Sequence, residues 1–126
     1  MPEGDPDGRE SAYELLRRGT KLLTENHPGA ASVLLERCLA LEPGKASILE
    51  ALARAYFNQG DPTRAAQRFQ EIVDGNPLAD YAHFGLGLCR ARLGDRRGAG
   101  RHLRMAVFLQ PENEDYRSAL RRVQAA

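Results

Sequence analysis

Histidine, cysteine and carboxylate side chains are the groups in this sequence that could do chemistry. The three histidines, His27, His83 and His102, show no second ligand at metal-binding spacing in the sequence. We expect them to lie in different units of the fold, one in a turn and two partly exposed on helices, rather than at a metal site. The sequence therefore predicts no metal centre and no cofactor.

The two cysteines, Cys38 and Cys89, stand in apolar helical contexts with no neighbouring base that could generate a thiolate. We interpret both as small core residues rather than nucleophiles. The Gly85-Leu86-Gly87 segment is not a phosphate loop, because it falls within a helix and lacks both a preceding strand and a following Lys-Ser/Thr pair. Carboxylates are scattered over helix faces. The chain is predicted not to be an enzyme.

Three prolines, Pro43, Pro77 and Pro111, stand 34 residues apart, and each follows a run that is typical of a helix. Proline ends such a run because it fixes φ and lacks the amide proton that a helix interior needs. A constant period of this length predicts an array of helical repeats, in which neighbouring units bury one another's apolar faces.

The predicted organisation is a disordered acidic tail over residues 1–10, followed by units over 11–44, 45–78 and 79–111. A final helix over 112–126, with a polar outer face, would cap the array. The expected helices run from about Ser11 to Glu25, Pro28 to Leu41, Lys45 to Gln59, Pro62 to Asp74, Ala79 to Leu93, Arg96 to Leu109 and Glu112 to Gln124.

Composition places the chain among single soluble domains. It has 126 residues, of which 42% are hydrophobic and 28% charged, and it contains no apolar run near the ~20 residues that a membrane span needs. The start lacks the features of a secretory signal, so the cytoplasm is the expected location. Residues 1–63 carry 7 basic and 10 acidic side chains, whereas 64–126 carry 11 and 7.

Aligned in register, the three units resemble the tetratricopeptide repeat, whose 34-residue signature is W-x2-L-G-x2-Y, A-x3-F and P. The second unit is closest, with Leu52, Tyr56, Ala65, Phe69 and Pro77. The first unit supplies Gly19, Ala31 and Pro43, and the third supplies Leu86, Gly87, Ala99 and Pro111. Arg18, His83 and Arg90 depart from the signature. The resemblance implies an all-α, right-handed solenoid of helix-turn-helix repeats.

In that family the first helix of each unit lines a concave groove that binds peptides. The positions that reach the groove would here hold Tyr13, Leu16, Thr20, Leu23 and Thr24 in the first unit, Ser47, Glu50, Arg54, Phe57 and Asn58 in the second, and Tyr81, Phe84, Leu88, Ala91 and Arg92 in the third. The family's carboxylate clamp for chaperone C-termini is missing, because Leu16, Thr20, Ala51, Tyr81 and Gly85 stand at its positions.

A helical-wheel count on residues 79–93 also favours a second apolar face. At ~100° per residue, Tyr81, Phe84 and Leu88 point roughly 130° away from the packing residues of that helix. One packed face does not explain a helix that is apolar almost all round. Either a ligand groove or coverage by the cap helix or the N-terminal tail would account for this stripe.

The sequence thus predicts a non-enzymatic protein-binding module that captures a peptide or an amphipathic helix. Aromatic anchors would supply most of the affinity, while Arg54, Asn58 and Arg92 would fix polarity and register. One alternative is a homo-oligomer formed through the same groove. A second, less favoured alternative is an acidic or nucleic-acid partner bound by the arginine-rich third unit. No membrane partner is expected.

Overall fold

The computed structural model describes residues 11–125, which form seven α-helices and no strands. The helices are α1 (Ala12–Thr24), α2 (Pro28–Leu41), α3 (Ala46–Asn58), α4 (Pro62–Gly75), α5 (Asp80–Arg92), α6 (Arg96–Leu109) and α7 (Glu114–Ala125). The predicted disorder of residues 1–10 lies outside the described residues.

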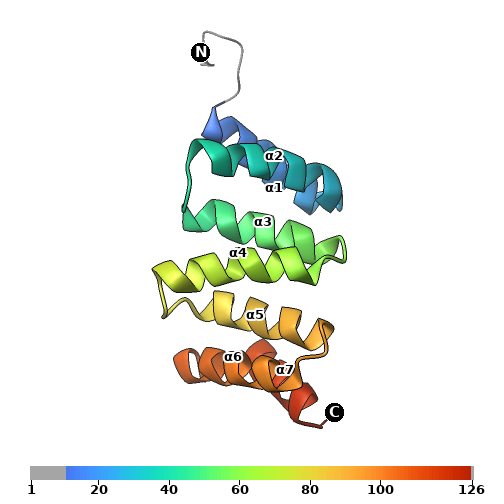
Figure 1. The fold of residues 1–126 in the computed structure, drawn as a ribbon, viewed down its shortest axis with the longest axis vertical. Helices are drawn as coiled ribbons and strands as arrows, with labels where there is room; N and C mark the ends of the chain where they lie inside the picture. The colour runs from blue at the N-terminus through green and yellow to red at the C-terminus, as the bar shows by residue number, and fades with distance from the viewer. Residues whose placement is uncertain (1–10, 126) are drawn as a thin grey trace.

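The helices stack along one axis, from α1 at one end to α6 and α7 at the other (Figure 1). The pairs α1–α2, α3–α4 and α5–α6 are helical hairpins, and α7 packs on α6 with a smaller contact to α5. Each helix therefore contacts mainly the helices next to it in the sequence. This arrangement confirms the predicted all-α solenoid.

The turns inside the hairpins follow from their residue types. Asp61 and Asp95 cap α4 and α6, because their carboxylates accept hydrogen bonds from the backbone N–H groups of Arg64 (3.1 Å) and Gly98 (2.8 Å). Gly60 and Gly94, which precede them, both have φ of +84°, a left-handed conformation that costs glycine little.

The last helix starts later than the sequence predicted, at Glu114 rather than Glu112. The side chain of Asn113 explains the difference, because its Oδ1 atom accepts a hydrogen bond from the backbone N–H of Tyr116 at 3.1 Å. This is the geometry of an N-cap, so the residues before Asn113 form a turn. The cap prediction mistook the two residues after Pro111 for helix.

Small residues let the hairpins close. A Cβ atom at Gly19 would lie 2.7 Å from the side chain of Leu35, and one at Gly87 would lie 2.6 Å from Leu103. Neither position has room for a larger residue, so the two glycines set the spacing of α1 against α2 and of α5 against α6. The interpretation of these positions as close helix contacts is confirmed.

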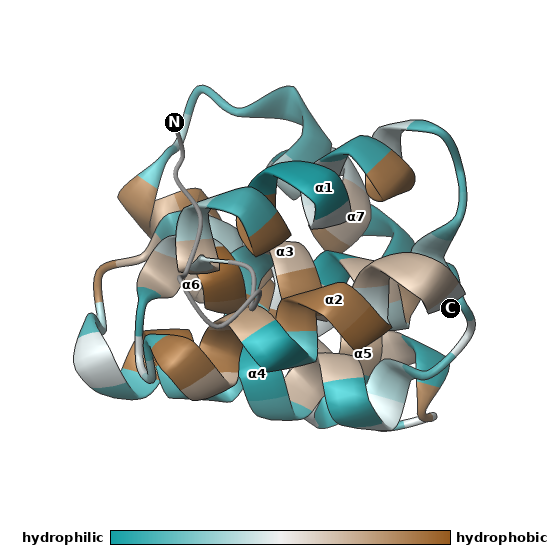
Figure 2. Cartoon of the chain, turned by 90° about the horizontal axis from the view of Figure 1, so that it is seen from above, coloured by the Kyte–Doolittle hydropathy of each residue, from teal (hydrophilic) through white to brown (hydrophobic). Residues whose placement is uncertain are grey.

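The core is a continuous apolar strip between the helices. Its main cluster extends from Leu23 in α1 to Cys89 in α5, and a smaller cluster around Leu15, Leu34 and Cys38 lies between α1, α2 and α3. Viewed down the stack, α2 shows largely hydrophobic residues (Figure 2). No helix within residues 11–125 has the length and apolar character needed to cross a membrane.

Candidate functional site

The main concavity of interest follows α3 and α5, the first helices of the second and third hairpins. Its first part is a hollow of about 270 Å³. Charged, aromatic and small side chains line it together: Glu50, Arg54, Phe57, Asn58, Phe69, Tyr81, Phe84, Gly85 and Leu88.

A second hollow, of about 690 Å³, continues from the first toward the end of α5 and is closed by α7. It is lined by Phe57, Leu88, Ala91, Arg92, Gly94, Arg96, Ala119, Arg122 and Val123. Phe57 and Leu88 line both hollows, so the two form one groove, which we call the α3–α5–α7 groove. The sequence predicted at most that the cap helix covers the stripe on α5, and no α7 side chain was named as a groove residue, because no repeat position assigns one to the concave face.

The structure brings together the groove positions that the sequence named in the second and third units, except Ser47, which lines neither hollow. Glu50, Arg54, Phe57, Asn58, Tyr81, Phe84 and Leu88 line the first hollow, and Arg92 lines the second. The first-unit positions lie outside both hollows. Tyr13 is 74% exposed, Leu16 packs against the core, and the Thr20 hydroxyl donates to the Leu16 carbonyl at 2.9 Å.

One side of the stripe on α5 is covered by α7. The rings of Phe84 and Tyr116 have centroids 4.7 Å apart, and the Tyr116 hydroxyl donates to Oδ2 of Asp80 at 2.5 Å. Burial and the nearby Asp80 carboxylate raise the pKa of the Tyr116 phenol, so its proton stays in this hydrogen bond. The alternative that the cap helix covers part of the stripe is therefore correct for Phe84, while Leu88 remains in the groove.

The two ends of the groove differ in charge. At the α7 end, the Arg92 guanidinium lies over the Phe57 ring, 4.5 Å from its centroid. Arg122 lies nearby and donates to the Ser118 hydroxyl at 3.0 Å. At the other end, the first hollow is lined by Glu50 and Arg54, one charge of each sign. Burial and then the negative charge of Glu50 raise the pKa of Tyr81.

The third arginine of the second hollow, Arg96, holds α7 in place. Its Nε atom donates to the Val123 carbonyl at 2.9 Å, and its Nη2 atom donates to the Gln124 carbonyl at 3.0 Å. These are carbonyls at the C-terminal end of a helix, which have no partner within the helix. Arg96 thus joins the start of α6 to the end of α7 and fixes the wall of the second hollow.

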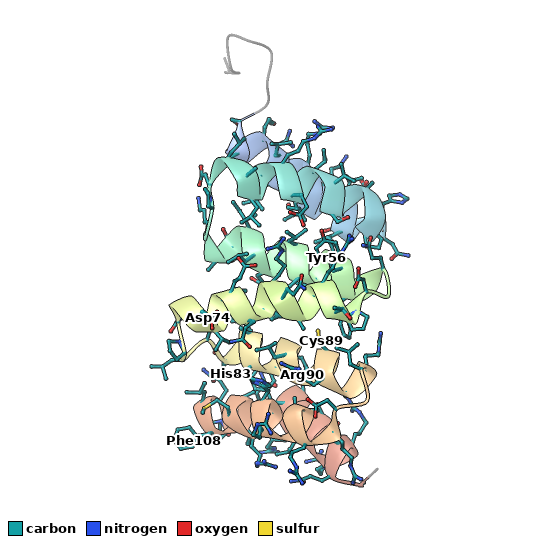
Figure 3. All side chains as sticks on the ribbon, viewed as in Figure 1. Tyr56, Asp74, His83, Cys89, Arg90 and Phe108 are labelled. Atoms are coloured by element: carbon teal, nitrogen blue, oxygen red, sulfur yellow. The ribbon has the colours of Figure 1, made fainter. Side chains whose placement is uncertain are left out.

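The prediction that the histidines lie apart was wrong for two of them. His83 and His102 stack with ring centroids 5.6 Å apart, and their Nδ1 atoms are 3.3 Å from each other. His83 is not partly exposed as expected but 7% exposed, and its Nε2 atom is 2.8 Å from the Pro77 carbonyl. Figure 3 shows His83 and Arg90 where α5 faces α6.

The contacts of this pair can all be hydrogen bonds when both imidazole rings are neutral. His83 donates from Nε2 to the carbonyl, which leaves its Nδ1 atom to accept from His102. Burial, the neighbouring His83 and two arginines lower the pKa of His102. Among residues 11–125 there is no group of three histidine, cysteine, aspartate or glutamate residues that could hold a metal ion. The two rings form a contact between α5 and α6.

Both cysteines are buried, as the sequence predicted. The Cys38 thiol lies 3.2 Å from the Ala12 carbonyl and donates to it. Burial raises the pKa of Cys89 to about 11. A thiol with that pKa is protonated at neutral pH and is a poor nucleophile.

Comparison with known proteins places the fold within a large group. A family model described as the tetratricopeptide repeat matches residues 16–77 and, in a second overlapping match, residues 50–114. The structure of the first TPR of Spaghetti (RPAP3) bound to HSP90 peptide SRMEEVD is 19% identical, with a TM-score of 0.86 over 99% of this chain and 97% of that chain.

Two further solved structures show the same architecture. The Sgt2 TPR domain from Aspergillus fumigatus is 19% identical, with a TM-score of 0.84 over 99% of this chain and 83% of that one. The second TPR domain of human RPAP3, in complex with HSP70 peptide SGPTIEEVD, is 19% identical, with a TM-score of 0.84 over 90% of this chain and 94% of that one.

Proposed function

Because the chain belongs to the tetratricopeptide repeat family, we propose that it is a non-enzymatic protein-interaction module whose α3–α5–α7 groove binds a peptide or an amphipathic helix. Glu50, Arg54, Phe57, Asn58, Tyr81, Phe84, Leu88 and Arg92 would contact the ligand. The continuity of the two hollows along α5 is the observation that carries this proposal, because it offers an extended surface rather than an isolated cavity.

The chemistry of the lining supports a peptide ligand. Tyr81, Phe84 and Leu88 follow one another at helical spacing, so their side chains form a stripe along the groove. Helical ligands insert apolar residues at the same spacing, and stripes of this kind are complementary to them. Phe57 projects from α3 between the two hollows and would separate successive ligand side chains.

Two structural relatives support the same general role. The first TPR of Spaghetti was solved with an HSP90 peptide and the second TPR domain of human RPAP3 with an HSP70 peptide. The groove of the present chain holds apolar residues such as Tyr81 where the chaperone-binding members of the family carry their clamp. We therefore propose that it binds a different class of peptide by apolar anchoring.

Selection from a phage-displayed peptide library against the immobilised full chain tests this proposal. We expect enrichment of peptides with apolar residues spaced for one helix face. Leu88→Ala and Tyr81→Ala should each weaken binding of the enriched peptides by roughly 1–3 kcal/mol. The matched control is Phe108→Ala, which removes a ring that is 77% exposed and lines neither hollow.

Light scattering over a range of protein concentrations tests the alternative of a homo-oligomer formed through the groove. In that case the mass of the parent protein rises with concentration while the Leu88→Ala variant keeps the mass of one chain. That result would show that a second copy occupies the groove instead of a peptide. The proposed function is wrong if selection on the parent protein enriches no library peptide relative to selection on the Leu88→Ala variant.

A further inference from the structure

The α7 end of the α3–α5–α7 groove combines an apolar floor with a positive rim. Phe57, Leu88, Ala91, Ala119 and Val123 form the floor of the second hollow. The charged side chains that line the same hollow are Arg92, Arg96 and Arg122, and no acidic side chain lines it. An apolar floor selects apolar ligand atoms, whereas a rim of guanidinium groups selects carboxylates or phosphates.

None of these three arginines has a carboxylate partner within residues 11–125. Within residues 11–125, neither Arg92 nor Arg122 forms an ion pair, and Arg96 donates only to carbonyls of α7. In contrast, Arg68 pairs with Glu36, and Glu114 pairs with two arginines. The arginine rim of the groove therefore carries positive charge that the fold itself does not neutralise.

The contact between Arg92 and Phe57 leaves hydrogen-bonding capacity. A guanidinium that stacks on a ring uses its flat face for that contact, and the N–H donors at its edge remain available for hydrogen bonds. The stacking also restricts the motion of Arg92, so less entropy is lost when its edge binds a carboxylate. The first hollow is lined by one acidic and one basic residue, Glu50 and Arg54, so an excess of positive charge is found only in the second hollow, and this difference distinguishes the two ends.

We propose that the groove recognises a polypeptide segment with apolar residues on one face and acidic side chains at one end, the acidic end lying on Arg92 and Arg122. The inference rests on the proposed function and names the partner chemistry for the same site. The apolar floor favours this ligand over a nucleic acid, whose phosphates would leave the floor uncovered. The segment would enter with its apolar residues against Phe57, Leu88 and Val123.

Three synthetic peptides test the inference by fluorescence anisotropy with the full chain. Each has about sixteen residues with leucine and phenylalanine on one helical face, and the three differ only in whether the last turn carries glutamate, glutamine or lysine. At low salt we expect the glutamate peptide to bind at least about fivefold more tightly than the glutamine peptide, and the lysine peptide to bind most weakly. The difference should shrink as salt is added.

Charge reversal in the protein gives the second arm. Arg122→Glu should reduce the affinity for the glutamate peptide about tenfold and increase that for the lysine peptide. Arg92→Glu should have the same effects on both peptides. If this variant disturbs the fold because it loses the stacking on Phe57, Arg122→Glu alone still tests the inference. Arg101→Glu is the matched control, because it makes the same charge change on α6 and lines neither hollow.

The outcomes separate this inference from the proposed function. Equal binding of all three peptides, or equal effects of Arg122→Glu and Arg101→Glu, would overturn the charge inference and leave the groove as a peptide site. Binding by none of the three would also overturn it, while the library selection decides independently whether any peptide binds. A single-stranded oligonucleotide that binds more tightly than the glutamate peptide, and that Arg122→Glu releases, would show a nucleic-acid site instead.

Discussion

The ring of Phe84 on α5 lies against the ring of Tyr116 on α7, with centroids 4.7 Å apart. This contact gives Phe84 two roles, since the same side chain lines the first hollow of the groove. A residue that joins the cap helix to the groove wall cannot be removed without some loss of stability. The sequence left open whether the stripe on α5 is a ligand groove or is covered by the cap helix, and Phe84 both lines the groove and contacts α7.

We expect Phe84→Ala to lower the free energy of unfolding by roughly 1–3 kcal/mol, because it removes a ring stack and part of the contact that holds α7. Urea denaturation followed by circular dichroism measures this change. Phe108→Ala, which removes a ring that is 77% exposed, should change the stability by less than about 0.5 kcal/mol. Equal effects of the two substitutions would show that the Phe84–Tyr116 contact contributes nothing.

The ring of Phe69 on α4 packs against the backbone of α5 at Gly85. A Cβ atom at Gly85 would lie within 2.6 Å of three atoms of the Phe69 ring, which is 6% exposed. Gly85→Ala should therefore cost about 1–3 kcal/mol by overpacking. Phe69→Ala should cost about 3–5 kcal/mol by leaving a cavity.

The double substitution Gly85→Ala with Phe69→Leu checks that mechanism, because the smaller side chain makes room for the new methyl group. The stability lost in the double variant should be less than the sum of the losses in Gly85→Ala and Phe69→Leu alone. Gly75→Ala is the control, since no atom lies within 4 Å of a Cβ placed there. That substitution should leave the stability unchanged or raise it slightly. Additive costs in the cycle would contradict the proposed steric conflict.

The cysteines provide a test of packing along the stack. Cys38 and Cys89 are fully buried, and the pKa of Cys89 is raised to about 11. An aromatic disulfide reagent at pH 8 should react with neither thiol in the folded protein and with both in denaturant. Fast labelling of one thiol in the folded protein would show that its hairpin opens, and mass spectrometry after digestion would identify which.

The contact between His83 and His102 predicts a loss of stability in mild acid. The pKa of His102 is lowered below its ordinary value near 6.5 by burial, by His83 and by Arg90 and Arg101, with Asp95 acting in the opposite sense. As pH falls below 6.5, the unfolded chain takes up a proton that the folded chain resists. The free energy of unfolding should therefore decrease from about pH 7 toward the lowered pKa.

His102→Gln keeps a side chain that can donate to His83 but cannot take up a proton in this range. Its free energy of unfolding should change less between pH 7 and pH 5 than that of the parent protein. His27→Gln serves as control, because His27 is exposed and lies in a turn. The interpretation fails if the two variants show the same pH dependence.

Much of the fold could be predicted because its determinants repeat in the sequence. Pro28 and Asp95 mark the starts of α2 and α6, and both helices have the bounds that the sequence predicted. The start of α7 was missed by two residues, since Asn113 caps that helix where the preceding Pro111 had been taken as the boundary. A side-chain cap depends on which of several polar residues adopts the required geometry, and spacing alone does not decide this.

The contact between His83 and His102 was missed, although the repeat register contains it. Each lies 68 residues, two repeats, after a residue of the first hairpin: His83 after Leu15 and His102 after Leu34. Leu15 and Leu34 belong to one buried cluster. Equivalent positions of a repeat occupy equivalent places, so the register could have placed the two rings together.

The charge pattern of the groove could not be predicted in the same way. Arg122 and Val123 belong to α7, whose position on the concave side depends on the Phe84–Tyr116 contact and on the hydrogen bonds from Arg96. Those are interactions between side chains that no repeat position specifies. The fifteen groove positions named from the sequence remain a proposal about ligand contact, and the five in α1 lie outside both hollows.

The stacking of each helix on its chain neighbours also determines how the molecule forms and opens. Contacts between residues close in the sequence require only short loops to be closed, so we expect folding within microseconds to milliseconds. In hydrogen exchange, α7 should lose protection first, because within residues 11–125 it packs mainly on α6 and has a smaller interface with the rest of the stack than α1 has. Since α7 forms one wall of the second hollow, each such opening would also release a bound segment. The fraying rate of α7 would then set an upper limit on how long that segment stays bound.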